Sequence, residues 1–323
     1  MPLRHVSRAL AAALTLALAH HAAAAQDYPT RNITVVVAFA AGGFADGIAR
    51  LIGQKVSERL GQTVVVENRG GAGGNIAAKL VAGAAPDGYT LLVTTTGLAI
   101  NETLAKNKGF AASDLKAVAI VGSTPEVLTV HPSNPAKTLP ELIKAAQGKS
   151  VSFGTAGVGT GSHIAAEYFF KALGKVQAVH VPFQGGAPAI NAAVGNHVEL
   201  LAASLAGGLA PQINSGALKG LAVASEQRVS IILNVPTYAE GGYPGFFAAS
   251  WVGFFAPAQT DAAVLGKLNA AVNEALKEPD VQQRLTALGV VSSATPQPQA
   301  DAYFRAETEK WRKMVNSIGL ATN

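Results

Sequence analysis

One pattern, a short strand followed by a glycine-rich loop and a helix, occurs twice in this chain. The first copy has a β-branched strand at 33–38, glycines at 42 and 43, and a helix that stops at Leu60-Gly61. The second copy has a strand at 151–153 and then the loop and helix of GTAGVGTGSHIAAEYFFKALG. Strands that alternate with helices of this length form parallel sheets with right-handed crossovers. The repeat therefore predicts two α/β lobes.

Both helices carry apolar residues at helical spacing, which predicts their buried faces: Ile48, Leu51, Ile52 and Val56 in the first, and Ile164, Tyr168 and Phe169 in the second. Each copy then continues with two more strands, at 63–66 and 89–94 in the first and at 178–183 and 198–202 in the second.

Two apolar runs can connect the lobes. The run at 115–132 has no crossover helix, so it can leave the first lobe and enter the second, and the run at 250–257 is a candidate for the return. Two amphipathic helical segments follow, and we expect them to pack back on the first lobe. The α/β class is predicted, with each lobe a mostly parallel sheet flanked by helices. The predicted bounds are 26–124 and 250–323 for lobe 1, 125–249 for lobe 2, and hinge strands near 117–131 and 249–256.

The first residues resemble a secretory signal peptide. Arg4 and Arg8 flank the start of an apolar stretch at 9–19, and three alanines end at Ala25, where cleavage is expected. The apolar stretch is shorter than the ~20 residues that span a bilayer. We expect a periplasmic mature chain that begins at Gln26 and does not insert into the membrane.

The composition narrows the chemistry. The 323 residues include no cysteine, which excludes disulfides and thiol catalysis. Removal of Arg4 and Arg8 with the leader lowers the 25 basic residues to 23 against 20 acidic ones, a net charge of +3. No long run of lysines and arginines is interleaved with aromatic residues, so nucleic acid is not an expected partner.

The glycine loops fit an anion site. In open α/β sheets, ligands lie at the carboxyl ends of strands, where helix N-termini offer free N–H groups and partial positive charge. The loops contain no basic side chain besides His163, but they offer neutral hydroxyl donors: Thr94, Thr95, Thr96, Thr155, Thr160 and Ser162. Glycines that merely permit tight turns would explain one such loop. Glycine loops at matching places in both predicted lobes favour a ligand-binding role instead.

Two enzyme motifs fail. Gly157 and Gly159 lack the third glycine of a dinucleotide fingerprint, and no GxxxxGK[ST] phosphate loop occurs. The GxSxG elbow fails at Ser162 and at Ser204. No catalytic residue and no cofactor are predicted, although a triad assembled in space stays open at this point.

Three ionisable residues have structural and functional interpretations. His163 and Glu167 lie four apart and could form a two-ligand metal face, but an intrahelical pair is favoured, so no metal is predicted. His180 is interpreted as a structural histidine in a strand. Asp46 has two interpretations of equal weight. In the structural one it complements the helix dipole and forms an i,i+4 pair with Arg50. In the functional one its carboxylate orients the loop or accepts a proton.

Several stretches resemble the extracytoplasmic receptors of tripartite tricarboxylate transporters, the Bug family. They are YPTRNITVVVAFAAGGFADGIARLIGQKVSERLG and its continuation to LLV, then GVGTGSHIAAEYFFKALG, VHVPFQGGAPAI, VPTYAEGG and SWVGFFAPA. The resemblance covers nearly all of the mature chain. It implies a type II periplasmic binding protein of the Venus flytrap kind, in which two lobes close on a carboxylate and pass it to a two-component membrane permease.

The resemblance also implies a set of substrate-binding residues. In the first lobe they are Phe39, Gly42, Gly43, Phe44, Ala45, Asp46, Thr94 and Thr95, and in the second Thr155, Gly157, Gly159, Thr160, Gly161, Ser162, Gly185, Gly186, Ala187, Ala203 and Ser204. The chain departs from the family pattern at Phe183, where relatives often have Tyr, and at Ala202-Ala203, where an aromatic-acidic pair is common. Phe44 also replaces a smaller or polar residue. We therefore expect a carboxylate ligand with an apolar or aromatic body.

The predicted function is a monomeric receptor for a small organic carboxylate, either a di- or tricarboxylate or an aromatic acid. An enzyme on the same two-lobed fold is the main alternative, because a fold alone does not determine a function. A sensor, in which the closed form docks on a signalling protein instead of a permease, is a third.

Overall fold

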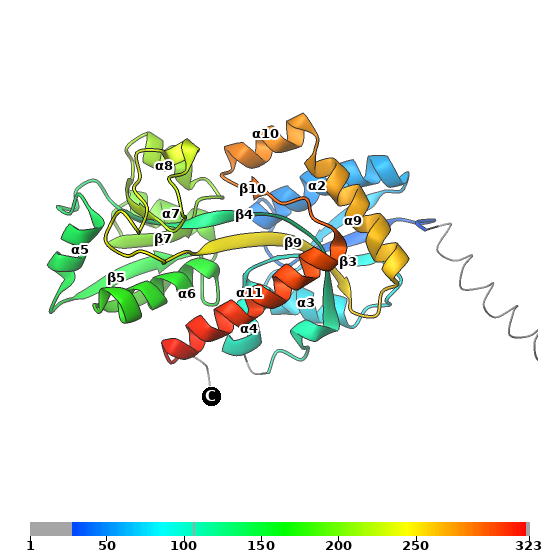
Figure 1. The fold of residues 1–323 in the computed structure, drawn as a ribbon, viewed down its shortest axis with the longest axis horizontal. Helices are drawn as coiled ribbons and strands as arrows, with labels where there is room; N and C mark the ends of the chain where they lie inside the picture. The colour runs from blue at the N-terminus through cyan, green and yellow to red at the C-terminus, as the bar shows by residue number, and fades with distance from the viewer. Residues whose placement is uncertain (1–27, 106, 321–323) are drawn as a thin grey trace, which may run out of the picture.

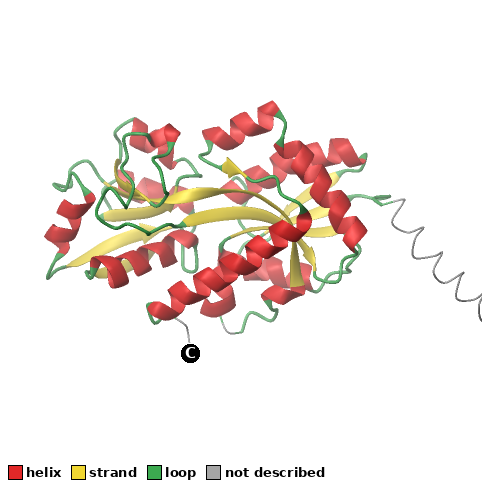
Figure 2. Cartoon of the chain, in the orientation of Figure 1, coloured by secondary structure: helices red, strands yellow, loops and turns green. Residues whose placement is uncertain are grey.

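The computed structural model describes residues 28–105 and 107–320, so the predicted signal peptide lies outside the described residues. The strands form one mixed sheet in the order β2-β1-β3-β9-β4-β7-β5-β6, and β8 and β10 also pair with β4. Helices flank this sheet on both faces (Figures 1 and 2), which confirms the α/β class. The strands are β1 Ile33–Val37, β2 Val64–Asn68, β3 Thr90–Thr95, β4 Leu115–Val130, β5 Ser150–Thr155, β6 Gln177–Pro182, β7 Leu200–Ser204, β8 Lys219–Val223, β9 Ala249–Pro257 and β10 Val291–Ser292.

The first half is built around β1, which pairs in parallel with β2 and with β3. Helix α2 (Phe44–Leu60) connects β1 to β2 and buries the four apolar positions predicted for it. It ends at Gly61, whose φ of 66° is the left-handed conformation that glycine adopts without strain. A 3₁₀ turn (Ala72–Gly74) and α3 (Asn75–Ala82) lead to β3, and α4 (Gly97–Leu104) follows it.

The second half repeats this arrangement around β5, which pairs in parallel with β6 and β7. Helix α6 (Gly161–Tyr168) follows β5 and continues into a π-helical turn at Phe169–Gly174. Helix α7 (Gly186–Val194) connects β6 to β7, α5 (Leu139–Ala146) precedes β5, and α8 (Leu209–Asn214) follows β7. The two copies of the sequence pattern therefore form two similar units.

The centre of the sheet is antiparallel. Strands β4 and β9 pair from Leu115 with Pro257 to Pro125 with Ala249, and β4 then continues at 126–130 beside β7 and β8. Both strands run along the long axis between the two halves (Figure 1). The predicted parallel pairing thus holds for the outer strands, whereas the centre is antiparallel because β4 and β9 cross the molecule in opposite directions without crossover helices.

The C-terminal helices are α9 (Ala262–Leu276), α10 (Pro279–Ala287) and α11 (Gln297–Ser317). Helix α9 packs against α2 and β4, as expected for a helix on the first half, but α11 contacts α4, β4 and also α6 of the second half. The buried side chains of Phe304 and Trp311 explain this position, since they belong to a core cluster that includes Leu92 of β3 and Ile164 of α6. Helix α11 therefore braces both halves.

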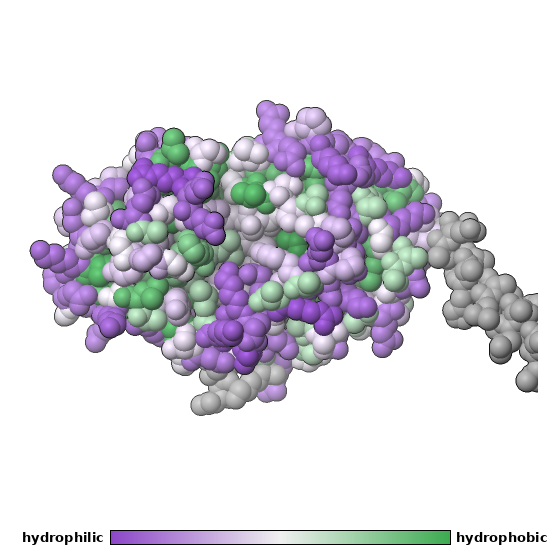
Figure 3. All heavy atoms as spheres, viewed as in Figure 1, coloured by the Kyte–Doolittle hydropathy of each residue, from purple (hydrophilic) through white to green (hydrophobic). Residues whose placement is uncertain are grey.

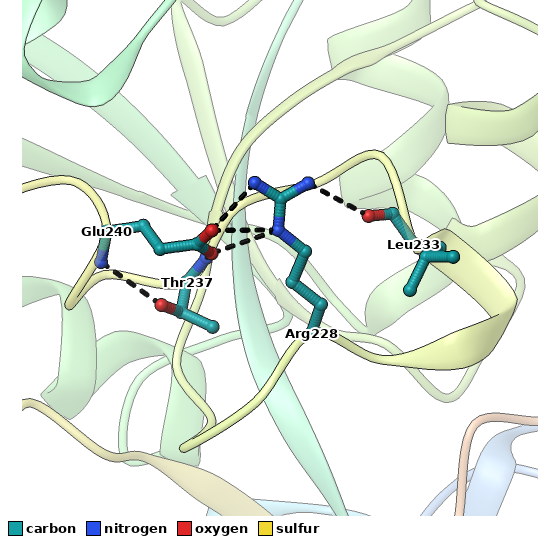
Figure 4. A network of polar contacts seen from close by, with 4 residues as sticks. All are labelled: Arg228, Leu233, Thr237 and Glu240. Carbon is teal, nitrogen blue, oxygen red and sulfur yellow. Dashed lines mark hydrogen bonds and ion pairs between the residues drawn. The ribbon is translucent and has the colours of Figure 1, made fainter.

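The VPTYAEGG segment forms a loop on the second half that is held by an ion pair between Arg228 and Glu240 (Figure 4). The Arg228 guanidinium donates to both carboxylate oxygens of Glu240, at 2.7–3.0 Å, and to the Leu233 carbonyl oxygen at 3.2 Å. Thr237 N donates to Glu240 Oε2, and Glu240 N donates to Thr237 Oγ1. These hydrogen bonds, from Arg228 first, lower the pKa of Glu240 to about 2. The motif is explained by this structural role.

The surface carries small, separate apolar patches among mostly hydrophilic side chains on the face in Figure 3. Within 28–105 and 107–320, none of the helices has the length and apolar character to cross a bilayer.

A glycine in β4 provides a test of this packing. Gly122 is paired with Ser292 of β10, and a Cβ added there would lie 2.4 Å from the Val291 carbonyl oxygen. Gly122→Ala should lower the free energy of unfolding in urea by about 1–3 kcal/mol, as overpacking does. Gly266→Ala, in the open interior of α9, should raise it by about 0.5–1 kcal/mol. Equal effects at the two positions would contradict the close pairing of β10 with β4 at Gly122.

Candidate functional site

The predicted site loops lie at the carboxyl ends of neighbouring parallel strands. In the first half, β1 and β3 run side by side, so the segments after Val37 and Thr95 lie at one sheet edge. In the second half, the segments after β5 and β6 are joined directly: Phe183 N donates to Thr155 O at 3.0 Å, and Gly185 N donates to Ala156 O at 3.1 Å. Each half therefore presents a pair of adjacent loops.

Asp46 shapes the first loop. Its Oδ2 accepts from Gly42 N at 2.9 Å and from Arg50 Nε at 3.0 Å, and its Oδ1 accepts from Asn68 Nδ2 at 2.9 Å. Burial alone would raise the pKa of this carboxyl, but the hydrogen bonds from Arg50, Gly42 and Asn68 outweigh burial and hold the pKa below its usual range. Asp46 therefore forms the predicted pair with Arg50 and also orients the loop, with both oxygens engaged within the protein.

Asn68 is a positioning residue that the sequence analysis missed. It ends β2, and its Nδ2 also donates to the Phe39 carbonyl oxygen at 3.0 Å. It thus ties the start of the loop to Asp46. Its place at the carboxyl end of a strand next to β1 was the available signal in the sequence.

The second loop is held by hydroxyl groups. Thr160 is the N-cap of α6: its Oγ1 accepts from His163 N at 3.3 Å, donates to Gly157 O at 2.8 Å, and lies 3.1 Å from Ser162 Oγ. Thr155 Oγ1 accepts from Gly157 N at 3.1 Å. These contacts fold the chain tightly around Gly157, whose φ of 136° favours glycine.

Two neutral histidines contact this loop from the protein interior. His163 Nδ1 accepts from Gly159 N at 3.2 Å, His180 Nε2 lies 2.6 Å from Thr155 Oγ1, and the two rings stack at 4.0 Å. Burial, with a smaller effect of His180 and Lys171, lowers the pKa of His163 to about 3, and burial lowers the pKa of His180 to about 4. The interpretation of His180 as a structural histidine in a strand agrees with this geometry.

The expected pairing of His163 with Glu167 is wrong. Glu167 instead forms an ion pair with Lys171 Nζ at 2.7 Å, while His163 turns toward Gly159. The physical reason is that the first turn of α6 is buried, so the His163 ring makes its hydrogen bond to the loop in front of the helix and not to the next helical turn.

No group of three or more His, Asp or Glu side chains able to hold a metal ion occurs within the described part of the chain.

The loops of the two halves touch. A Cβ on Gly159 would lie 2.7 Å from Asn101 Oδ1 of α4, and a Cβ on Gly97 would lie 3.5 Å from the Gly159 carbonyl oxygen. Asn101 is buried, and its Nδ2 donates to Gly73 O at 3.1 Å. Asn101 therefore lies between the 3₁₀ turn of the first half and the loop of the second. Asn101 was not among the predicted residues, because a lone Asn inside an apolar helix gives no signal of a distant partner.

The remaining predicted residues occupy several environments. Thr94 is buried and Thr95 is half-buried, and Gly185 and Gly186 begin α7 beside the second loop, with Ala187 exposed. Phe39 and Phe44 are half-buried against the core. Ala203 is buried in a core cluster of the second half, and the Oγ of Ser204 is buried.

The arrangement can bind an anion without a basic side chain. Helices α2, α4 and α6 all begin at these loops, so their first-turn N–H groups bring partial positive charge to the region. The hydroxyl of Thr95 adds a neutral donor, whereas Thr160 Oγ1 already donates to Gly157 O and Ser162 Oγ is paired with Thr160 Oγ1. Because both histidines are neutral and Asp46 is engaged by Arg50 and Asn68, the helix ends dominate the local field.

The contact between the halves generates a prediction. Gly159→Ala should push the loop away from Asn101 and favour an open arrangement, seen as a larger radius of gyration in small-angle X-ray scattering. Gly148→Ala is the matched control, because Gly148 has a similar φ of 73°, against 77° at Gly159, but open surroundings. Both variants should lose about 1–2 kcal/mol to backbone strain. Identical scattering from the two variants would show that Gly159 does not limit the approach of the halves.

Comparisons with known proteins bear on this geometry. A family model for the tripartite tricarboxylate transporter family receptor matches residues 48–320. The solved structure of the periplasmic binding protein BugD is 32% identical with a TM-score of 0.83, and the match covers 92% of this chain and 100% of BugD.

Two further solved structures carry bound carboxylates. MatC (Rpa3494) from Rhodopseudomonas palustris with bound malate is 34% identical, with a TM-score of 0.80 over 89% of this chain and 100% of that one. Rpa4515 from R. palustris with adipate is 31% identical, with a TM-score of 0.84 over 91% of this chain and 99% of that one. Because the family model spans most of the chain and these structures share its fold almost from end to end, the chain belongs to the tripartite tricarboxylate transporter receptor family as a Bug-type periplasmic substrate-binding protein, which is a receptor and not an enzyme.

Proposed function

We propose that this receptor binds a small organic carboxylate between the loop at 38–46 and the loop at 154–162, and delivers it to a two-component membrane permease. One observation carries the proposal: Gly159 of the second half lies against Gly97 and Asn101 of the first. This contact brings the N-terminal ends of α4 and α6 together in a region without basic side chains. A carboxylate there would receive N–H and hydroxyl donors from both halves.

The bound ligands of the similar structures support the same chemistry. MatC carries malate and Rpa4515 carries adipate, so this fold accommodates acids of different length and polarity. For this chain we propose a periplasmic location, with the leader at 1–25 directing export. Ligand would favour the closed arrangement through its greater affinity for two loops than for one.

The ligand is proposed to have an apolar body. Phe39 and Phe44 are half-buried, so each keeps part of its ring outside the core while the rest packs against it. Phe44 is the first residue of α2, directly after the loop that Asp46 orients. An apolar chain or ring held near a carboxylate at this helix end would cover the free part of these rings.

A thermal-shift screen of residues 26–323 tests the proposed function. The panel contains malate, adipate, citrate, benzoate, phthalate and glutamate, each beside its amide. A carboxylate at 100 times its dissociation constant should add about 2.7 kcal/mol to the free energy of unfolding, and its amide should add much less. Stabilisation by amides and acids alike would contradict an anion site. If none of the acids stabilises the protein, small organic carboxylates are excluded as the ligand class.

Truncation of Phe44 tests the apolar contact. Phe44→Ala should weaken binding of the best acid about ten- to a hundredfold in isothermal titration, because about 1.5–3 kcal/mol of apolar burial is lost. Phe247→Ala, which removes another partly exposed ring outside residues 38–46 and 154–162, should leave the affinity unchanged. Unfolding curves of both variants separate loss of stability from loss of contact. Equal affinity of Phe44→Ala and the wild type would reject the contact.

A further inference from the structure

Glu126 lies at the point where β4 passes from one half to the other. Residues 115–125 of this strand pair with β9, whereas Glu126 pairs with Ser204 of β7 and begins the segment shared with the second half. The backbone is fixed on both sides, because Glu126 N donates to Ala248 O at 3.0 Å and Ala224 N donates to Glu126 O at 2.8 Å. The residue is 4% exposed.

The Glu126 carboxyl touches the start of α6. Ser250 Oγ of β9 donates to Glu126 Oε1 at 2.5 Å. A Cβ on Gly161, the first residue of α6, would lie 2.9 Å from Glu126 Oε1 and 2.5 Å from Ser250 Oγ. Glu126 Oε2 is buried and has no hydrogen-bond partner among the described residues. A carboxyl group with one unsatisfied oxygen therefore lies under the helix end that serves the second loop.

Few other ionisable groups surround this carboxyl. Strands β7 and β9 carry no titratable side chain. On α6, His163 is held neutral and Glu167 pairs with Lys171, and from the neighbouring loop the buried Tyr238 has its pKa raised by burial and by Glu126. Burial raises the pKa of Glu126 to about 7, although the hydrogen bond from Ser250 favours the ionised form.

We propose that Glu126 is a proton-linked positioning residue, whose carboxylate competes with the bound carboxylate for the N-terminal end of α6, so that ligand binding is accompanied by proton uptake at Glu126. The inference rests on the proposed function and names a regulation of the same site. Thr160 Oγ1 already accepts a hydrogen bond from His163 N. The backbone N–H groups of Gly161 and Ser162 are therefore the ones left for an anion. Two negative charges near one helix end repel each other, so the neutral acid is favoured in the complex.

The direction of the pH dependence follows from this competition. Ligand binding raises the pKa of Glu126 above its value of about 7 in the free protein, so affinity is highest below pH 7 and falls as the pH rises through 7. Each unit by which the ligand raises that pKa corresponds to a tenfold loss of affinity at alkaline pH. Above pH 6 the ligand carboxylates are already ionised, so their own titration does not produce this loss.

Isothermal titration with adipate and with malate, from pH 6 to pH 9, tests the inference. Measurements at pH 7.5 in phosphate and in Tris, whose ionisation enthalpies differ, give the number of protons taken up. The wild type should take up a fraction of a proton and lose about tenfold in affinity across the range. Glu126→Gln should take up none and change less than twofold. Ser250→Ala, which removes the hydrogen bond to Oε1, should move the midpoint of the wild-type profile to higher pH.

The outcomes separate the two proposals. Binding by the wild type without proton uptake, and with the same pH profile as Glu126→Gln, overturns the role of Glu126 and leaves the proposed function intact. Absence of binding to either acid, by the wild type as well as the variant, contradicts the proposed function and the inference together. Thermal unfolding without ligand checks that the variants fold. The stability of the wild type relative to Glu126→Gln should fall as the pH rises from 4.5, the ordinary pKa of the carboxyl, to about 7, its pKa in the folded protein, and should then stay level.

Discussion

The pairing of β4 with β9 is the constraint on which the rest of the molecule depends. These two antiparallel strands run through the centre of the sheet, so each half contributes to the same hydrogen-bonded ladder. Because both are almost wholly buried, the pairing fixes how far apart the loops of the two halves can lie. Helix α11 adds a brace, since its apolar face packs on elements from both halves.

The ionisable side chains near the loops serve geometry more than charge. Asp46 is engaged by Gly42, Arg50 and Asn68, and the histidines at 163 and 180 are buried and neutral. In the proposed site, the field on a carboxylate would come from helix ends, which are fixed by the backbone, and from the ionised fraction of Glu126. Two similar structures hold acids of different shape, malate in one and adipate in the other.

The positions missed in the sequence share one property, which is a partner far away in the chain. Asn68 reaches Asp46 across 22 positions, Asn101 reaches Gly73 across 28, and Glu126 reaches Ser250 across 124. Local patterns report the strand or helix in which a residue lies, but not which segments the sheet brings beside it. The His163 interpretation failed for the same reason, because its spacing to Glu167 was visible and its burial behind the loop was not.

The sequence by itself determined the two strand–loop–helix units, the buried face of the first helix and the family, because each depends on spacing over a few residues or on motifs read in order. In the second helix the predicted Tyr168 is only half-buried. The tertiary structure decided the antiparallel centre, the contact of Gly159 with Asn101 and the place of Glu126 beneath α6. These features depend on strands that pair across more than a hundred residues. Their energies come from burial and shared hydrogen bonds, which exist only once the chain has folded.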